Sequence, residues 1–535
     1  MVNFKLLDCT LREAPLDRLL WGELFTHKVI RGLENAGINI IEIGFLKDCT
    51  YEPGSTCFSC VEDIEPYLLN KKADVMYVAL VDYGRFDLSN LSDYDGRTID
   101  AIRICFKHNE IEDVLDYASQ IRAKGYKVCI QHVDTMGYQD EEIVKFVRKV
   151  NEFKPFSYSI VDTFGAMYSK DVMHYADIIN RELDEDIWMG LHTHNNMMLA
   201  DANAQLYTDE LIGKRKIIVD TSLYGCGRSA GNAHTELMTT YMNKNHEFQY
   251  DINEVLDLID TVITAAQKKT TWGYSIPYFI SGMYNAHTFN VNQLLKRHNI
   301  KSKDLRAIMG MLDEKQKKAY DYVLLEKLYV QYFDNPVDDE AVLNELTEAF
   351  SGREILLLGP GASIKDNCEK IHQFISVTKP IVVGVNNVID GFCLDYIFYS
   401  GSIRYDNLKY QTHKLTRLPK LIVTSNIKVE ADINEYIVNY NSLIKYGWIN
   451  MDSSIILLMR LMIKCQVRKM YMAGLDGYTG SGDAFYDNEL DTNMNATDRV
   501  EHTNDNISMM KDILADNKDL QVRFLTASIY EEVFQ

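Results

Sequence analysis

The chain has 535 residues, 46% of them hydrophobic, which is enough apolar surface for two or three domains. Acidic residues outnumber basic ones by 77 to 56, and the formal net charge of −21 argues against nucleic acid and anionic membranes as partners. The ten cysteines are scattered, the first residues lack a signal-peptide pattern, and no apolar run approaches the ~18 residues that cross a bilayer. We therefore expect a cytoplasmic protein with reduced thiols.

Short apolar runs alternate with helical stretches over the first 220 residues. Eight runs can be counted: Phe4–Asp8, Asn39–Phe45, Asp74–Val81, Ala101–Phe106, Lys127–Val133, Tyr158–Asp162, Ile187–His192 and Lys216–Asp220. Strands buried on both faces have this apolar pattern, so residues 1–250 are predicted to form an α/β domain of the (β/α)8 TIM-barrel type. Chemistry in such barrels lies at the carboxyl ends of the strands, which here carry Asp8, His192, His194 and Asp220.

The strand pattern disappears after the predicted barrel and returns later. Residues 251–350 have helical patterning and are predicted to be a helical extension. Residues 351–535 again alternate strands and helices, which favours an open, Rossmann-like α/β sheet. Its predicted strands are Glu354–Leu358, Pro380–Val385, Asp395–Tyr399, Leu421–Thr424, Lys469–Ala473 and Val522–Leu525.

Two histidines and an aspartate suggest a metal site in the barrel. His192 and His194 lie on the same side of an extended strand, because side chains alternate along a strand. Asp8 ends the first strand, which in a closed barrel neighbours the eighth and so lies near the seventh. Mixed oxygen and nitrogen ligands suit Mn²⁺, Mg²⁺ or Zn²⁺. The alternative is a pair of histidines that only make structural hydrogen bonds.

Three segments carry a family resemblance. Leu7–Glu13 resembles the D-x-T-L-R-[DE] signature of the DRE-TIM metallolyases, His192–Asn196 resembles their H-x-H-[ND]-[ND] segment, and Gly225–Glu236 resembles their glycine-rich loop. The family includes hydroxymethylglutaryl-CoA lyase, isopropylmalate and homocitrate synthases, and 4-hydroxy-2-oxovalerate aldolase. Over roughly residues 1–290 the chain is most similar to the aldolase-like members.

The resemblance implies roles for individual residues. Asp8, His192 and His194 would hold a divalent metal, with Asn232 as a further ligand, and Arg12 would stabilise an enolate. The alternative for Arg12 is a salt bridge with Glu13 or Glu42. The segment Ala14–Asp17 departs from the aldolase pattern and has no histidine, so the general base stays open. The candidates for it are Glu13, Asp162, Tyr224 and His287, and Glu42, Asp162 and Tyr224 are expected to line the substrate pocket.

The C-terminal domain carries a second, looser resemblance. Gly359, Gly361 and Ser363 lie between a predicted strand and a predicted helix, a setting in which backbone amides can approach a phosphate. The alternative is that this turn is only a tight connection between the strand and the helix. With later segments, this turn resembles bacterial sialyltransferases and related nucleotide-binding domains of polysaccharide loci. The resemblance implies that a cytidine or uridine nucleotide sugar contacts Asn386, Asn387, Ser453, Tyr478 and Tyr486. His502 would be the general base, or alternatively an ordinary surface residue.

These observations lead to three functional hypotheses. The leading one is an enzyme of surface-glycan or capsular polysaccharide biosynthesis, in which a metal-dependent aldolase or lyase acts on a 2-oxo acid or sugar-derived carbonyl and the second domain is a glycosyltransferase. The second is an acyl-CoA-dependent Claisen-type synthase with a regulatory nucleotide-binding module. The third is a glycosyltransferase with a catalytically silent barrel. In each case we expect small-molecule substrates and a homo-oligomer.

Overall fold

The computed structural model describes residues 3–13, 21–297, 300–411, 417–429, 435–479, 485 and 496–535. The chain divides into two compact units. The barrel unit comprises residues 1–291 and 314–320, and the C-terminal unit comprises residues 292–313 and 321–535. Within the described ranges, no helix has the length and apolar character needed to cross a membrane.

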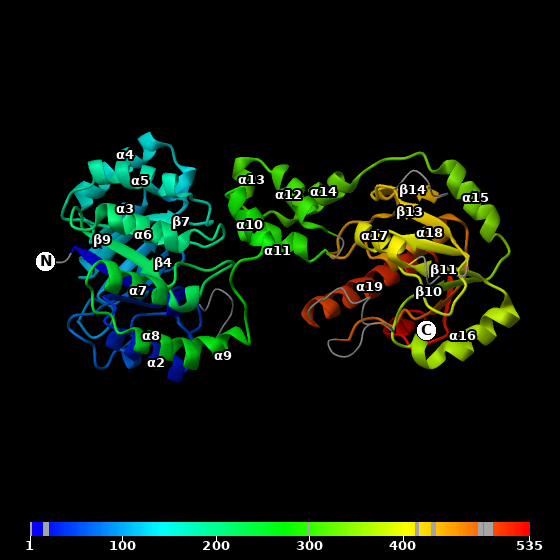
Figure 1. Cartoon of the computed structure of the whole chain (residues 1–535), viewed down its shortest axis with the longest axis horizontal. Helices are drawn as coiled ribbons and strands as arrows, with labels where there is room; N and C mark the ends of the chain where they lie inside the picture. Colours follow the sequence, from blue (N-terminus) through cyan, green and yellow to red (C-terminus); the bar gives the residue numbers. More distant parts are fainter. Residues whose placement is uncertain are drawn as a thin grey trace. The chain divides into compact units, whose positions relative to one another are not determined.

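The barrel unit contains a closed sheet of eight parallel strands (Figure 1). Strand β1 (Phe4–Asp8) pairs with both β2 and β9, which closes the sheet into a barrel. The other strands are β2 (Ile40–Leu46), β4 (Met76–Asp82), β5 (Ala101–Cys105), β6 (Lys127–His132), β7 (Ser157–Asp162), β8 (Trp188–Thr193) and β9 (Ile217–Thr221), and the short β3 (Cys57–Phe58) extends β2 on one side. The TIM-barrel prediction is confirmed, with every predicted strand within a few residues of its observed bounds.

Helices cover the outside of this barrel. They are α2 (Glu23–Ala36), α3 (Val114–Ala123), α4 (Asp140–Phe153), α5 (Ser169–Glu182), α6 (Ala200–Leu211), α7 (Thr235–Asn245) and α8 (Ile252–Leu258), and a one-turn helix α1 (Thr10–Glu13) follows β1. In α4 the buried side chains are Ile143, Phe146, Val147, Val150 and Phe153. This spacing of three and four residues forms one apolar stripe, which packs on the strands while the charged face stays in solvent.

Alternation along the strands decides which side chains enter the barrel. Leu7 of β1 packs in an interior cluster with Ile40, Val78 and Ile218 from other strands. Asp8, the next residue, therefore lies on the outer face of β1. The interior also contains polar groups, among them Arg103, Gln131 and Asp220.

Helices and the turns between them make up the described residues from 251 to 350, and this region is divided between the two units. After α8 come a short π-helix (Ile259–Ile263), α9 (Thr264–Gln267), α10 (Ile276–Met283), α11 (Thr288–Leu295), α12 (Ser302–Gly310), α13 (Glu314–Lys318), α14 (Tyr322–Phe333) and α15 (Glu340–Phe350). Helices α10 and α13 belong to the barrel unit, and α12, α14 and α15 belong to the C-terminal unit.

The C-terminal unit is built on a second parallel sheet, in the order β14-β13-β12-β11-β10-β15-β16. The strands are β10 (Ile355–Leu358), β11 (Ile381–Val385), β12 (Tyr396–Tyr399), β13 (Lys420–Thr424), β14 (Glu435–Val438), β15 (Lys469–Ala473) and β16 (Gln521–Phe524). The sequence had not indicated β14. A second parallel sheet is therefore present, whereas its assignment to the Rossmann-like class stays a prediction.

Both faces of this sheet are covered. Ile355 and Leu357 of β10 pack in one core, and Leu356 and Leu358 pack in another on the opposite face. The helices involved are α15, α16 (Ile364–Thr378), α17 (Ser402–Gln411), α18 (Ser454–Lys464) and α19 (Ala496–Asp516). Successive strands extend from β10 in one direction and then resume on its other side with β15, so the strand order reverses beside β10.

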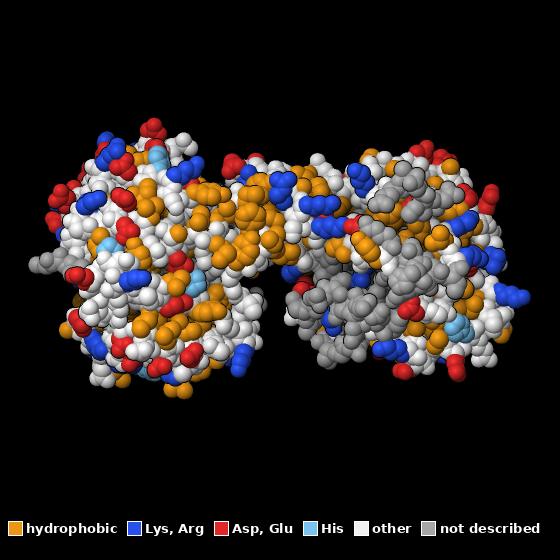
Figure 2. All heavy atoms as spheres, viewed as in Figure 1, with side chains coloured by type: hydrophobic (Ala, Val, Ile, Leu, Met, Phe, Trp, Pro, Cys, Tyr) orange, Lys and Arg blue, Asp and Glu red, His pale blue; other side chains and the backbone are white. Residues whose placement is uncertain are grey.

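The acidic excess of the chain does not gather into one patch on the face of the barrel unit that Figure 2 shows. Acidic and basic side chains are interspersed there, with apolar side chains between them. The charges that matter for the candidate site are instead buried.

Candidate metal centre

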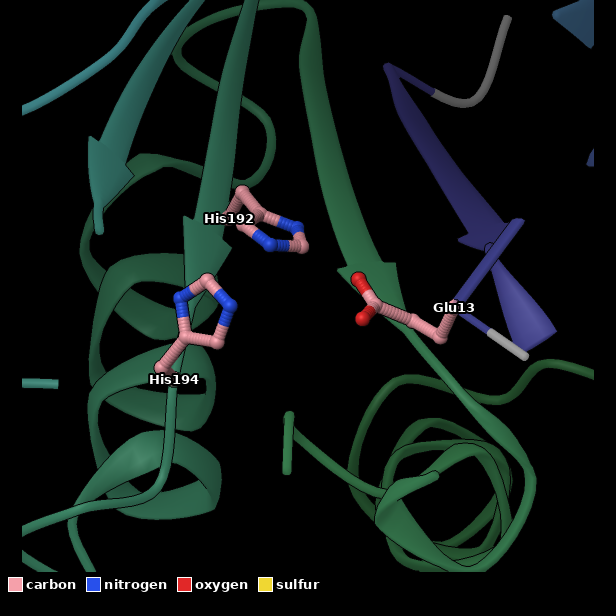
Figure 3. Close-up of side chains that lie close together, drawn as sticks. All are labelled: Glu13, His192 and His194. Carbon is pink, nitrogen blue, oxygen red and sulfur yellow. The ribbon is translucent and has the colours of Figure 1, made fainter. Parts of the chain in front are cut away.

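Glu13, His192 and His194 converge at the mouth of the barrel. One ligand atom from each lies within 4.8 Å of the other two, and all three residues are buried. Figure 3 shows the Glu13 carboxylate directed toward the two imidazole rings. Among the His, Cys, Asp and Glu side chains of the described residues, no other group of three meets this condition.

The local fold explains this convergence. His192 belongs to β8 and His194 follows its last residue, so the two rings project from the same side of the extended segment. Helix α1 begins two residues after the end of β1 and places Glu13, its last residue, over the end of the barrel. The three side chains thus come from the carboxyl ends of strands, where barrel enzymes carry their active sites.

Asp8, which we expected to be a metal ligand, is not a member of this group. Its Oδ1 accepts a hydrogen bond from the Thr10 N–H (2.9 Å), and its Oδ2 accepts one from the Thr235 hydroxyl (2.6 Å). The physical reason is strand alternation, because Leu7 points into the barrel and Asp8 must point outward. Asp8 instead joins the start of α1 to the start of α7, and burial raises its pKa to about 6.

Hydrogen bonds fix the orientation of both histidines. Nδ1 of His194 donates to the Asp162 carbonyl oxygen (2.9 Å), and Nδ1 of His192 lies 3.0 Å from Asp220 Oδ2. Each ring therefore keeps Nε2 for a ligand. Metal-binding histidines commonly have such a partner on the second nitrogen, which sets the tautomer and the ring plane.

Asn232, the expected further ligand, has an amide oxygen that accepts no hydrogen bond from the residues the structure describes. The residue is 1% exposed, its Nδ2 donates to the Cys226 carbonyl (2.9 Å), and its backbone forms an isolated bridge with His194. A buried amide oxygen without a partner is uncommon, and carbonyl oxygen is a good ligand for a hard divalent cation. This atom supports the fit of a metal beside His194.

The protonation states also suit a cation. Burial opposes ionisation of Glu13, but the charge of Arg12 outweighs it and lowers the pKa of Glu13 to about 2. Burial lowers the pKa of His194 to about 3. At neutral pH the site therefore offers an ionised carboxylate and a neutral imidazole, which are the forms that bind metals.

A chain of buried ion pairs lies next to the three candidate ligands. Arg12 pairs with Glu13 and, through Nε, with Glu42 (2.8 Å). Arg103 pairs with Glu42 (2.9 Å) and with Asp220. We call these five residues the buried charge network. It connects Glu13 to Asp220, the residue that orients His192.

The network bears on two sequence predictions. The alternative role considered for Arg12 was a salt bridge with Glu13 or Glu42, and the structure contains both of these salt bridges. Glu42, which we expected to line the substrate pocket, is therefore an ion-pair partner of Arg12. Arg103 was missed, although its signal was present, because a charged residue in the middle of the apolar run Ala101–Cys105 must find a partner inside the barrel.

A pocket adjoins the metal centre. It is lined by Thr163, Phe164, His194, Asn196, Arg228, Ser229, His287 and Thr288. Of the four candidates for the general base, His287 lines this pocket and Glu13 belongs to the metal group.

The other two base candidates lie elsewhere. The Asp162 carboxylate accepts hydrogen bonds from the Ala166 and Met167 N–H groups, burial raises its pKa to about 7, and it does not line the pocket. The Tyr224 side chain is exposed and also lies outside the lining. The segment Ala14–Asp17 lies outside the described residues.

A second pocket lies in the C-terminal unit, at the carboxyl ends of the strands where their order reverses. In open parallel sheets this is the usual place for a ligand. Six residues predicted from the sequence line it: Gly361, Asn386, Asn387, Ser453, Tyr478 and His502. Tyr486 lies outside the described residues.

The glycine turn of that pocket is occupied by a carboxylate of the chain itself. The Ser363 N–H donates to Asp476 Oδ2 (2.8 Å), and a Cβ on Gly361 would lie 2.6 Å from the Asp476 carboxyl. Gly359 is packed against the Gly474 carbonyl and is not part of the lining. The turn is therefore a tight connection around Asp476, and the Ser363 amide that a phosphate would need is already bound.

Comparison with known proteins supports the reading of the barrel. Residues 105–265 match the protein family described as HMGL-like. An oxaloacetate decarboxylase from Mycobacterium tuberculosis is 25% identical over 258 residues, which cover 47% of this chain and 74% of that protein. A 4-hydroxy-2-oxovalerate aldolase from Rhodococcus jostii is 26% identical over 270 residues, 49% of this chain and 74% of the relative.

Among solved structures, the N-terminal domain of a candidate aldolase from Bacteroides vulgatus aligns with a TM-score of 0.46 and 23% identity, over 55% of this chain and 96% of that one. The family match covers strands β6 to β9 and the two histidines of the metal centre. Within the barrel unit, the similarity to the HMGL-like family thus extends over residues 105–265.

Proposed function

We propose that the barrel unit is a divalent-metal-dependent lyase of the aldolase type, which makes or breaks a carbon–carbon bond next to the carbonyl of a 2-oxo acid or a sugar-derived carbonyl compound. The observation that carries this proposal is the convergence of Glu13, His192 and His194 at the barrel mouth. The HMGL-like match and two relatives whose names specify 2-oxo acids support it.

Glu13, His192 and His194, with Asn232 as a fourth ligand, would hold Mn²⁺, Mg²⁺ or Zn²⁺. A cation bound there would act as a Lewis acid toward the carbonyl oxygen of the substrate. The mixture of carboxylate, imidazole and amide ligands is compatible with each of these ions.

The chain itself supplies the remaining groups. Arg12 would stabilise the negative charge that develops on the enolate oxygen, and the ion pairs with Glu13 and Glu42 hold its guanidinium in place beforehand. His287 lines the same pocket as His194 and would donate a hydrogen bond to the substrate oxygen that gains or loses the proton. Burial lowers the pKa of His287 to about 4, so the ring is neutral at pH 7, and its Nδ1 accepts the Phe289 N–H, which leaves the hydrogen on Nε2.

The test uses the full chain, stripped of metal with a chelator and then reloaded with Mn²⁺, Mg²⁺ or Zn²⁺. We expect pyruvate release from oxaloacetate or from 4-hydroxy-2-oxo acids only in the loaded protein, and its loss in Glu13→Gln and His192→Ala. Thiol release from an acyl-CoA in place of cleavage would favour the Claisen-type synthase. A bound metal without any metal-dependent reaction would favour the silent barrel.

A second candidate function concerns the C-terminal unit, for which we keep binding of a cytidine or uridine nucleotide sugar as a proposal. It is supported by the six predicted residues that line one pocket beside the strand-order reversal. A glycosyltransferase activity with His502 as base, and a role in surface-glycan synthesis, would follow from such binding. Thermal-shift measurements with CMP and UDP sugars test it, because a ligand that binds only the native state raises its apparent stability.

A further inference from the structure

The pocket beside the metal centre contains an arginine whose side chain has no partner among the described residues. Each of the other arginines described in the barrel unit has its guanidinium on a carboxylate or a backbone carbonyl. Arg228 lines the pocket, is partly exposed, and forms no ion pair or side-chain hydrogen bond with the described residues. Among the arginines of the barrel unit that the structure describes, Arg228 is thus the one with neither kind of partner, in a chain whose net charge is −21.

The backbone holds Arg228 against the metal centre. Its N–H donates to Glu13 Oε2 (3.3 Å), and its carbonyl accepts the Gly231 N–H (2.9 Å) across a tight turn in which Ser229 has φ +62°. A Cβ on Gly227 would lie 2.6 Å from the Asn232 amide, so this loop packs directly on the fourth candidate ligand. The base of the Arg228 side chain is therefore fixed relative to the cation position.

The surroundings of Arg228 suit an anion. The pocket lining offers the hydroxyls of Ser229, Thr163 and Thr288, and it contains no carboxylate among the described residues. The charge of Arg228 also lowers the pKa values of Glu13, His194 and His287, although Arg228 is not the largest influence on any of them. The guanidinium is thus close enough to act on groups that surround the same small space.

We propose that Arg228 binds the carboxylate of the substrate and so selects a 2-oxo acid over an acyl thioester. This inference rests on the proposed function, because it assumes that the reacting carbonyl lies at the metal centre. A guanidinium can bind a carboxylate through two parallel hydrogen bonds, which fixes orientation as well as affinity. An acyl-CoA has no carboxylate beside its reacting carbonyl and would gain nothing from this group. Arg228 would therefore be a specificity-determining residue.

The test is calorimetric titration of the full chain with oxalate, an unreactive mimic of a 2-oxo acid, in the presence of Mn²⁺ and again after chelation. Charge-assisted hydrogen bonds contribute about 1.5–3 kcal/mol, so we expect Arg228→Met to weaken oxalate binding by roughly 10- to 100-fold. Mn²⁺ affinity should change little, since the Arg228 side chain is not a ligand, and Arg228→Lys should recover part of the loss. Arg97→Met is the matched control, because the exposed Arg97 forms its ion pairs with Asp95 and Glu65, neither of which is part of the metal centre or its pocket.

The outcomes separate this inference from the proposed function. If Arg228→Met and the wild type bind oxalate equally with and without Mn²⁺, the role of Arg228 is overturned, while metal-dependent cleavage can still stand. If the wild type binds no Mn²⁺, the proposed function fails, and the chelated samples still decide on Arg228, since only an Arg228-dependent oxalate affinity supports it. Binding of acetyl-CoA that is equal in both proteins, without any binding of oxalate, also overturns it.

Discussion

The two pockets of this protein differ in how they can recognise a ligand. At the barrel mouth, five buried charged residues form ion pairs next to two histidines. The adjoining pocket is lined by Arg228, whose guanidinium has no partner in the described part of the chain. The C-terminal pocket is lined by amides, hydroxyls and aromatic rings, and among its described lining residues Asp476 is the only acidic side chain and there is no Lys or Arg. The barrel is thus suited to a cation and a small anion, and the C-terminal pocket to a ligand bound by neutral hydrogen bonds.

The difference between the two pockets shows that buried charged side chains restrict one another's positions more strictly than buried amide side chains do. A charge removed from water must have a partner at close range, so each member of the buried charge network fixes the next. The C-terminal pocket is less constrained, because the buried amide oxygens of Asn386 and Asn506 accept no hydrogen bond from any described residue. These two oxygens are acceptors that a ligand with N–H or O–H groups could satisfy.

The largest expected effect on metal-dependent cleavage is that of Glu13→Gln, for which Asp8→Asn serves as the comparison variant. Glu13→Gln preserves size but removes the charged ligand, and we expect metal-dependent cleavage to fall by on the order of 10²–10³ or more. Asp8→Asn should cost closer to 10-fold, since Asp8 acts only by fixing helices around the site. Metal content and pyruvate release measure both. An equal loss of bound metal in the two variants would contradict the assignment of Glu13.

A second test breaks the buried charge network at Arg103. Arg103→Met leaves Glu42 and Asp220 buried with one counter-charge fewer, which should lower the free energy of unfolding by about 3–5 kcal/mol. Mn²⁺ affinity should fall by about 10- to 100-fold, because Asp220 no longer holds His192 in place. Urea unfolding of the metal-free protein and Mn²⁺ titration report the two effects separately. Arg103→Lys keeps the positive charge and should lose less unfolding free energy and less Mn²⁺ affinity than Arg103→Met. If Arg103→Met binds Mn²⁺ as tightly as the wild type, the buried charge network does not position the ligands.

Acid should act first on the barrel unit. Burial lowers the pKa of His132, in β6, to about 3, so this residue is neutral in the folded protein and takes up a proton on unfolding below its ordinary pKa of about 6.5. Its contribution to stability is therefore complete above pH 6.5 and is lost as the pH falls toward 3, by about 2 kcal/mol at pH 5. His132→Gln should show a correspondingly smaller loss between pH 7.5 and pH 5.

Tryptophan positions allow this pH effect to be assigned to one unit. Trp21, Trp188 and Trp272 lie in the barrel unit and Trp448 in the C-terminal unit, so fluorescence of Trp448→Phe follows the barrel alone. Unfolding is measured in urea with a chelator present. A pH dependence of the barrel signal that is the same with and without His132 would contradict the prediction.

The smallest effect is expected at Asp476 in the C-terminal pocket. Asp476→Ala frees the Ser363 N–H at the start of α16 and should cost about 1 kcal/mol of stability, as loss of a helix cap does. It should also open the glycine turn to inorganic phosphate, which would then raise the melting temperature of the variant and not of the wild type. Equal stabilisation of both proteins by phosphate would show that the wild-type turn is already accessible to anions.

The architecture of the barrel could be read from the sequence because strands that are buried on both faces are apolar throughout. All eight strands of the closed sheet were predicted in this way, and the histidines followed from their spacing. Asp8 was predicted in place of Glu13 because it ends the first strand, which lies near the seventh strand in a closed barrel, and that argument did not consider the direction of its side chain. Since Leu7 faces the interior, alternation alone already directs Asp8 outward, whereas the position of Glu13 depends on how α1 turns over the barrel mouth.

In the C-terminal unit the sequence identified residues that meet in one pocket, but not how they meet. The short strand β14 (Glu435–Val438) was missed because its residues are only partly buried and its pattern is weak. The glycine turn has the sequence pattern of a phosphate-binding loop. In the structure, however, the Ser363 N–H of this turn donates to the carboxylate of Asp476, which lies more than a hundred residues later in the chain. Such a contact depends on which strands become neighbours, and β10 and β15 are distant in sequence.

The charges at the barrel mouth imply that the cation and the acid bind cooperatively. Three carboxylates face two guanidinium groups there, and Arg228 adds a third positive charge, so the empty centre has no net charge with which to attract an anion. A divalent ion would add two positive charges, which a dicarboxylate such as oxaloacetate would neutralise. Loading with the cation should therefore strengthen capture of the acid, and a cell short of the metal would hold a folded enzyme that collects its substrate only weakly.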